Sequence, residues 1–185
     1  NRPRAAMDKI IYLGYKEHDS TKGQKIEKFQ FLEDKFANYF VVTFIGTFGK
    51  YHDPRILIDC AKRTGGLKII YVLGGDGEFN DELRESARLL ENVFFVGWLN
   101  QNEATRLLEL SNLGVCSTGN YTNKNFFPNK VYSYWAAGLP TASAFQGELY
   151  EIIKQYRVGF NYTNLDEFVS GIHRFYYDPA GYSEA

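Results

Sequence analysis

Two loops of this sequence combine glycine, lysine and small polar residues in a way that suits the binding of an anion. The first, Gly46-Thr-Phe-Gly-Lys-Tyr-His52, follows the apolar run Val41-Val-Thr-Phe-Ile45. Its glycines let backbone amides approach a ligand closely, and Lys50 or His52 adds positive charge. A tight strand-to-helix turn with a surface lysine explains this loop equally well.

The second loop, residues 117–130, is long and polar and precedes a helical segment that starts near Val131. A loop of this kind between short buried elements is usually functional. Asn129 is predicted to cap the helix, and free amides with Lys130 beside them would attract a diphosphate. A capped helix with a solvated lysine is the alternative interpretation, and the loop alone does not separate the two.

A third glycine-rich loop, residues 74–78, departs from the dinucleotide-binding pattern because Asn80 stands where the third glycine belongs. Asp76 and Glu78 are therefore interpreted as turn and capping residues. The histidines and cysteines have no metal-ligand spacing, so no metal or other cofactor is expected. The sequence also lacks a nucleophile elbow of the Gly-x-Ser-x-Gly type, which disfavours nucleophilic hydrolysis.

The elements that must position these loops alternate regularly from about residue 40. Short runs that are nearly continuously apolar are typical of strands buried on both faces, and the segments between them have helical periodicity. The runs span residues 41–45, 67–73, 93–96, 113–116, 141–143 and 158–162. This order predicts an α/β fold, a doubly wound, Rossmann-like parallel sheet of about six strands with helices on both faces. Ligands of such sheets bind beyond the carboxyl ends of the strands.

Composition places limits on domain organisation and location. Residues 41–185 are predicted to form one domain, and residues 1–40 a connecting or edge region from a missing N-terminal domain, because the chain opens like a linker without an initiator Met. The formal charge of −1 argues against a nucleic-acid-binding protein. No signal peptide or membrane-spanning run is visible. Cys60 and Cys116 look like buried free thiols, so a cytoplasmic location is expected, with peripheral association at the inner face of the membrane left open.

Taken together, four stretches resemble the C-terminal, donor-binding domain of the retaining group 1 glycosyltransferases, whose architecture has two Rossmann domains (the glycosyltransferase B fold). They are FIGTFGKYHDPRILIDCA, YVLGGDGE, NVFFVGWLNQNEATRLLELSNLGV and FFPNKVYSYWAAGLPTASAFQGELYEII. They occur in the family's order. The resemblance implies an enzyme that transfers a sugar from a nucleoside-diphosphate sugar to a glycan or lipid-linked acceptor without a metal, in surface polysaccharide synthesis.

The resemblance also implies which residues bind the diphosphate. In the family, a Gly-Arg pair follows the first strand, and a Lys lies five residues beyond the Arg. Gly46 matches the Gly, whereas Thr47 and His52 stand at the two cation positions. Our hypothesis is that Lys50, His52 and Lys130 replace the missing cations. The predicted diphosphate site comprises Gly46, Thr47, Phe48, Gly49, Lys50, His52, Asn129 and Lys130.

The family carries two Glu residues, with seven residues between them, that contact the sugar and the ribose hydroxyls. Asn125 and Ser133 stand at these positions, so both carboxylates are absent, although Pro128-Asn-Lys130 matches a Pro-Ser-Lys variant of the family. Replacing a charge-assisted bond with a serine hydroxyl weakens binding by roughly 1–2 kcal/mol. The predicted sugar and ribose contacts are Asn125, Ser133, Gly147 and Glu148, and the predicted base contacts are Gly97, Trp98 and Leu99.

Three functions follow from these observations. A glycosyltransferase is the leading one, although the chain alone is expected to be inactive because the acceptor site and remaining catalytic groups would belong to the N-terminal domain. The lost carboxylates favour a degenerate nucleotide-sugar-binding or scaffold subunit instead. A nucleotide-sugar epimerase of the same architecture would need catalytic carboxylates and histidines that are not identified here, and no catalytic residue is assigned.

Overall fold

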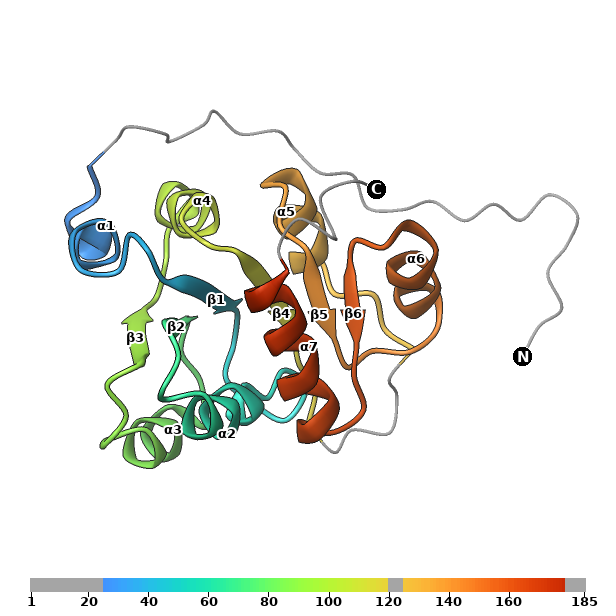
Figure 1. Cartoon of the computed structure of the whole chain (residues 1–185), viewed down its shortest axis with the longest axis horizontal. Coiled ribbons are helices and arrows are strands. Elements are labelled where there is room, and N and C mark those ends of the chain that lie inside the picture. Colours follow the sequence, from blue (N-terminus) through green and yellow to red (C-terminus); the bar gives the residue numbers. More distant parts are fainter. Residues whose placement is uncertain (1–24, 120–124, 179–185) are drawn as a thin grey trace, which may run out of the picture.

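The sheet of this protein has six parallel strands in the order β3-β2-β1-β4-β5-β6, and helices cover both of its faces (Figure 1). A computed structural model describes residues 25–119 and 125–178. The strands are β1 (Phe40–Ile45), β2 (Ile69–Gly74), β3 (Val93–Gly97), β4 (Leu113–Cys116), β5 (Thr141–Ser143) and β6 (Gly159–Asn161). Each of the predicted apolar runs contains one of these strands or overlaps it, and the doubly wound, Rossmann-like fold is confirmed.

The helices are α1 (Gln30–Asp34), α2 (Arg55–Arg63), α3 (Asn80–Ser86), α4 (Gln101–Glu109), α5 (Lys130–Ala136), α6 (Glu148–Tyr156) and α7 (Leu165–Tyr177), and a short 3-10 helix, η1 (Glu27–Phe29), precedes α1. Pro54 stands one position before α2 and not at its first residue. The side chain of Asp53 accepts a hydrogen bond from the backbone amide of Arg55 (3.0 Å), as expected of a residue at a helix start. The apolar run at residues 9–13, which from sequence alone could be a strand, lies outside the described residues.

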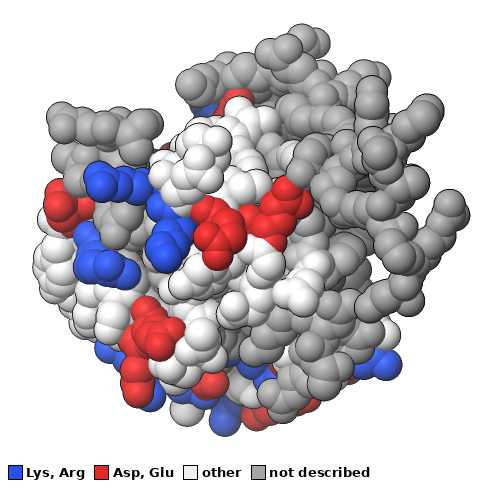
Figure 2. Space-filling model, turned by 90° about the vertical axis from the view of Figure 1, so that its right-hand side faces the viewer, with Lys and Arg blue, Asp and Glu red and all other residues white. Residues whose placement is uncertain are grey.

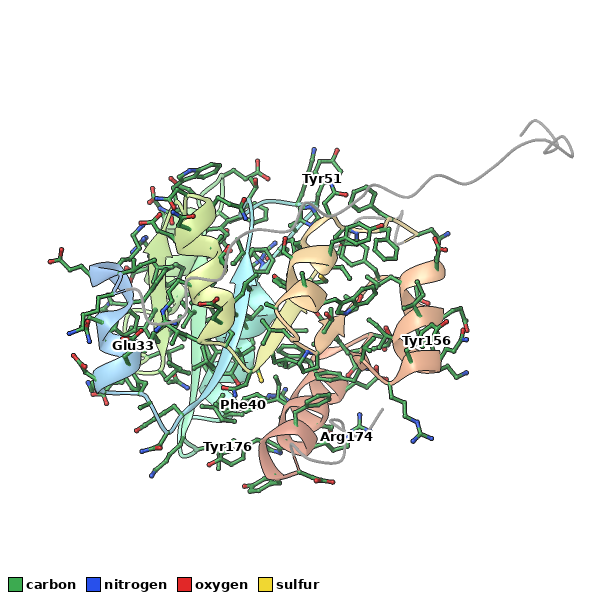
Figure 3. The ribbon with its side chains drawn as sticks, turned by 90° about the horizontal axis from the view of Figure 1, so that it is seen from above. Glu33, Phe40, Tyr51, Tyr156, Arg174 and Tyr176 are labelled. Atoms are coloured by element: carbon green, nitrogen blue, oxygen red, sulfur yellow. The ribbon has the colours of Figure 1, made fainter. Side chains whose placement is uncertain are left out.

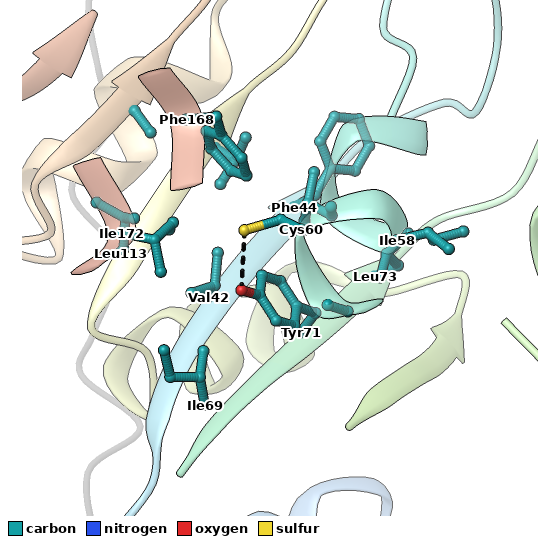
Figure 4. Packing of buried hydrophobic residues seen from close by; sticks show 14 of the residues in the cluster. Val42, Phe44, Ile58, Cys60, Ile69, Tyr71, Leu73, Leu113, Phe168 and Ile172 are labelled. Carbon is teal, nitrogen blue, oxygen red and sulfur yellow. Dashed lines mark hydrogen bonds between the residues drawn. The ribbon is translucent and has the colours of Figure 1, made fainter. Parts of the chain in front are cut away.

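One face of the sheet packs on α2 and α7, as Figure 4 shows. Val42, Ile69 and Tyr71 point from the sheet into this cluster. The Tyr71 hydroxyl lies 3.1 Å from Cys60 Sγ, so a buried polar group is satisfied inside the core. Burial raises the pKa of Cys60 to about 11. Both described cysteines are buried free thiols, as predicted.

The other face is covered partly by the segment before β1. Phe29, Leu32 and Phe36 are buried against Ile70 and Val72 of β2. From sequence alone, residues 25 to about 36 look like a single helix, but in the structure they form η1 followed by α1. This segment therefore contributes to the core of the sheet.

Within the described ranges, no helix is both long and apolar enough to cross a membrane. On the face drawn in Figure 2, acidic and basic side chains lie close to one another among neutral ones. A broad basic surface of the kind that binds nucleic acid is not visible among the described side chains of this face.

Candidate functional site

A pocket of about 500 Å³ opens at the carboxyl edge of the sheet. The strand order reverses between β1 and β4, which is where doubly wound sheets bind their ligands. The loops that follow β1, β4 and β5 line the pocket. Its lining residues are Thr47, Gly49, Tyr51, His52, Thr118, Phe126 and Phe145.

The backbone amides of the loop after β1 are mostly engaged within the protein, which corrects the expectation that its glycines offer theirs to a ligand. Gly46 N donates to Gly74 O (2.9 Å), and Phe48 N donates to Asp76 O (2.9 Å). Lys50 N donates to the carboxylate of Glu78 (3.2 Å). The reason is that the parallel ladder between β1 and β2 continues into the two loops.

Thr47 is the exception in this loop. It lines the pocket, and its amide has no hydrogen-bond partner within residues 25–119 and 125–178. The loop therefore offers one backbone donor at the position where the family carries an arginine.

Glycine is required where the loops after β1 and β2 pass each other. Gly75 has φ +136°, and a Cβ there would collide with the carbonyl oxygen of Gly46. Gly77, with φ +156°, meets the backbone of Phe48 in the same way. These glycines permit backbone-to-backbone packing. The loop of residues 74–78 therefore supports the site. Asp76 acts as a turn residue, since its side chain accepts from Gly77 N (2.8 Å), whereas Glu78 is not a cap of α3, whose N-cap is Phe79 without a side-chain capping hydrogen bond.

The side chain of Lys130, the first residue of α5, lies against the loop that follows β1. Its Nζ lies 3.9 Å from the centroid of the Phe44 ring, and a Cβ added to Gly46 would come within 2.7 Å of it. Nζ is buried and has no hydrogen-bond partner in the described part of the chain. Desolvation lowers the pKa of Lys130 to about 8, so the group remains mostly protonated at neutral pH. The structure thus places an ammonium group without an acceptor beside Gly46.

His52 lies between this lysine and the pocket aromatics. The pKa of His52 is lowered to about 4. Burial is the main cause and the charge of Lys130 is the second, whereas a hydrogen bond with the backbone of Ser117 acts in the opposite direction and raises the pKa. The imidazole is therefore neutral near pH 7. In the protein without a ligand, His52 therefore does not carry the positive charge that the hypothesis assigns to it, because the site desolvates the imidazole next to another positive charge. Lys50, in turn, directs its Nζ toward the Tyr51 ring (5.2 Å).

The start of α5 differs from the predicted capped helix. Asn129 occupies the N-cap position, but its backbone is helical and its side chain makes no capping hydrogen bond. The amides of Val131 and Tyr132 are not free, because they donate to Pro128 O (3.1 Å) and Asn129 O (3.2 Å) in tight turns. The cationic character of this end of the helix therefore comes from the Lys130 side chain.

The predicted sugar and ribose contacts lie on the loops around the pocket. Asn125 and Gly147 are brought together, since a Cβ on Gly147 would lie 3.3 Å from Asn125 Oδ1. Gly147 has φ +72° and precedes α6, whose first residue is Glu148. Ser133 is partly exposed in the middle of α5.

The predicted base contacts lie at the edge strand β3, two strands away from β1. Gly97 O accepts from Gly75 N (2.7 Å), and Trp98 O accepts from Lys28 Nζ (3.0 Å). Leu99 packs on Gly74, where a Cβ would come within 2.6 Å of its side chain. Two carbonyls of this loop are thus occupied, while the Trp98 side chain is 76% exposed and presents a flat apolar ring.

Sequence reasoning missed Tyr51, Thr118, Phe126 and Phe145, which line the pocket. A signal was available, because each of them stands in a loop that follows a strand. The high aromatic content can mostly be accounted for by strands and core, so residue type alone does not single out these rings. Phe126 is 51% exposed and Tyr51 49%, which is unusual for core residues and typical of binding surfaces.

Metal ligands are not clustered at this edge. Within the described residues, no three His, Cys, Asp or Glu side chains lie close enough to hold a metal ion. Besides Lys130, two further buried polar atoms at this edge, His52 Nδ1 and Ser117 Oγ, have no hydrogen-bond partner in the part of the chain that the structure describes. Buried polar groups are normally paired, so their concentration beside a pocket indicates a place for a ligand.

A doubly wound sheet with a pocket and an unsatisfied cation at its switch point defines a Rossmann-like ligand-binding domain. The family model for glycosyl transferases group 1 matches residues 39–178, most of the chain, and the chain therefore belongs to this family. A search of curated proteins found no match.

Solved glycosyltransferase structures share the fold at low sequence identity. HepE from Anabaena, in complex with UDP and glucose, gives a TM-score of 0.69 at 20% identity, covering 84% of this chain and 44% of that one. The C-terminal domain of a group 1 family protein (LpcC) from Francisella tularensis gives 0.67 at 17% identity, covering 88% and 89%. The catalytic domain of cholesterol-α-glucosyltransferase from Helicobacter pylori gives 0.65 at 17% identity, covering 77% and 89%. The chain thus spans less than half the length of HepE.

Proposed function

We propose that this chain is the donor-binding domain of a retaining, metal-independent glycosyltransferase that takes a hexosyl group from a nucleoside-diphosphate sugar. The observation that carries the proposal is the buried Lys130 ammonium, which has no acceptor among the described residues and lies next to Gly46 at the pocket edge. A diphosphate oxygen supplies the missing acceptor. The complex of HepE with UDP and glucose supports the same ligand class.

In this proposal the domain promotes the departure of the nucleoside diphosphate. Negative charge develops on the diphosphate as the bond to the sugar breaks, and preorganised donors stabilise that charge. Lys130, the Thr47 amide and the Ser117 hydroxyl are donors at this edge that lack partners within the described ranges. We assign the diphosphate to Gly46, Thr47 and Lys130, with Lys50 at the rim. Trp98 stacks on the base.

The acceptor and the location also belong to the proposal. A group 1 glycosyltransferase of two Rossmann domains binds its glycan or lipid-linked acceptor through the other domain. We infer a role in surface polysaccharide synthesis at the cytoplasmic side of the membrane. The coverage of 89% of the Francisella C-terminal domain supports the assignment of this chain to the donor-binding half.

A thermal-shift screen with UDP-, GDP-, ADP- and CMP-linked sugars tests the proposal, because a ligand specific for the folded state raises Tm. Calorimetry then compares the wild type with Lys130→Ala for the best ligand. Lys154→Ala, a change of an exposed lysine on α6, is the matched control. The proposal fails if none of the nucleotides shifts Tm. If both variants bind like the wild type, Lys130 is not part of the binding site.

A second candidate is a degenerate member that binds a nucleotide sugar without transferring it. It is favoured by Asn125 and Ser133, which stand where the family carries carboxylates. Assays of the longer natural protein with the selected donor distinguish the two. Transfer or donor hydrolysis supports the enzyme, whereas tight binding without turnover supports the degenerate member.

A further inference from the structure

The pocket at the carboxyl edge is lined mainly by aromatic rings. His52, Phe126 and Phe145 come from three different loops, and their ring centroids lie 6.2–6.4 Å apart with mutual tilts near 50°. Tyr51 lines the same pocket and lies at the end of the molecule opposite Phe40 and Tyr176 (Figure 3). Aromatic faces at this spacing bind the apolar C–H face of a flat ligand.

The lining contains little that would pair with hydroxyl groups. None of the pocket residues carries a formal charge at neutral pH, since the pKa of His52 is lowered to about 4. The polar groups among the described lining residues are the side chains of Thr47, Thr118 and His52 and the hydroxyl of Tyr51, and the family's sugar-contacting carboxylate is replaced by Asn125. A sugar hydroxyl that is buried without a partner weakens binding.

We propose that this aromatic pocket holds the sugar of the donor and selects one in which a methyl group replaces or masks a hydroxyl. Such sugars are the 6-deoxyhexoses and the N-acetylhexosamines. Both carry a methyl group that the aromatic rings of the pocket can shield from water. The inference rests on the proposed function, because the nucleotide must bind beside the pocket.

Phe126 is central to this inference. It is 51% exposed, and it lies between Asn125, which neighbours Gly147, and the His52 ring. A methyl group placed against Phe126 and Phe145 would be removed from water where it touches the rings. Burial of one methyl group increases affinity by about fivefold. Contact with a neutral imidazole avoids the desolvation of a charge.

Calorimetric titration of the chain with UDP, UDP-glucose, UDP-6-deoxyglucose and UDP-N-acetylglucosamine tests the inference, with GDP, GDP-mannose and GDP-6-deoxymannose as a second series. Base and stereochemistry are constant within each series. We expect at least one methyl-bearing donor to bind about fivefold more tightly than its hydroxylated parent. The 6-deoxy and N-acetyl ligands show which source of the methyl group is preferred.

Phe126→Ala removes the ring and is expected to abolish this preference while leaving the affinity for UDP or GDP unchanged. Tyr156→Ala is the matched control, because Tyr156 is similarly exposed (57%) and lies away from Tyr51 (Figure 3). Equal binding of parent and methyl-bearing donors, or a preference that survives Phe126→Ala, overturns the inference and leaves the proposed function standing. If neither series binds, the proposed function and the inference fail together.

Discussion

Lys130 combines burial and charge in a way that folded proteins usually avoid. Its Nζ has no hydrogen-bond acceptor in the described part of the chain, and the Phe44 ring at 3.9 Å offers only a cation–π contact. An unpaired buried charge destabilises the folded state. The nearby Cys116 thiol remains protonated, since burial raises its pKa to about 12. Binding of an anion would therefore pair this charge and remove part of the destabilisation that it causes in the free protein.

Lys130→Met is expected to stabilise the free protein and to weaken ligand binding. Met keeps the volume and removes the charge, so we expect a gain of about 1–2 kcal/mol in the free energy of unfolding at pH 7. The affinity for the nucleoside diphosphate should fall about tenfold. Urea unfolding and calorimetry measure the two effects. A variant that is destabilised, or that binds as tightly as the wild type, contradicts the assignment.

The stability difference between these two proteins should depend on pH. The pKa of Lys130 is lowered from 10.5 to about 8 in the folded protein, so between these values the unfolded chain binds more protons. The stability of the wild type therefore rises with pH across this window relative to Lys130→Met. Unfolding curves at several pH values should show the advantage of the variant shrinking above pH 8. A constant difference would mean that the lysine is solvated.

His52 predicts a pH effect in the acid range. Its pKa falls from 6.5 in the unfolded chain to about 4 in the folded protein, so the unfolded state binds more protons between these values. The contribution of a neutral His52 is lost as pH falls from 6.5 through 4. His52→Asn removes this titration. As pH falls through that window, the unfolding free energy of the wild type should decrease relative to that of the variant. Parallel pH curves for the two proteins would contradict a buried, neutral imidazole.

At the scale of elements, Tyr134 links α5 to the ends of two strands. Its hydroxyl donates to Val115 O of β4 (3.2 Å) and accepts from Ile45 N of β1 (3.3 Å). The ring is fully buried and occupies the space that a side chain at Gly114 would need. The position of Lys130 on α5 therefore depends on a glycine in β4.

Gly114→Ala should destabilise the protein by about 1–3 kcal/mol, because the added methyl group collides with the Tyr134 ring and cannot be accommodated by a flexible side-chain end. Gly66→Ala is the control, since a Cβ there meets nothing within 4 Å. Urea unfolding of both variants gives the comparison. Equal midpoints would show that α5 can shift away from β4 without cost, and the proposed placement of Lys130 would then be weak.

Most strands could be predicted because a strand buried on both faces has a nearly continuous apolar run, although the edge strand β3 is only partly buried. All six residues of β2 are buried, and its sequence is apolar almost throughout. The environments of the site residues could not be predicted in this way. Whether His52 is charged depends first on its burial and then on Lys130, which is distant in sequence. Whether the Gly46 amide is free depends on Gly74 O. Residue type shows which hydrogen bonds and charges a side chain or amide could supply. The packing of several loops decides which of these groups are available to a ligand.

At the scale of the whole molecule, the core extends beyond the region that matches the family model. That match begins at residue 39, whereas Phe29, Leu32 and Phe36 are at most 5% exposed and cover Ile70 and Val72. Ion pairs join the same segment to α4, between Lys28 and Glu103 and between Arg106 and Glu33. Lys28 also holds the Trp98 carbonyl (3.0 Å), which connects this segment to the predicted base-binding loop.

A chain that starts at residue 39 should therefore be less stable than one that starts at residue 25. Each of the three buried side chains contributes about 1.5–3 kcal/mol, so we expect the shorter chain to unfold at much lower urea or to aggregate through the uncovered sheet. Circular dichroism during urea titration measures the difference. The Phe36→Ala variant of the longer chain should lie between the two, because it removes one of the three contacts. Identical transitions for the two lengths would show that the sheet is stable without this cover and that the family boundary is also the boundary of the folding unit.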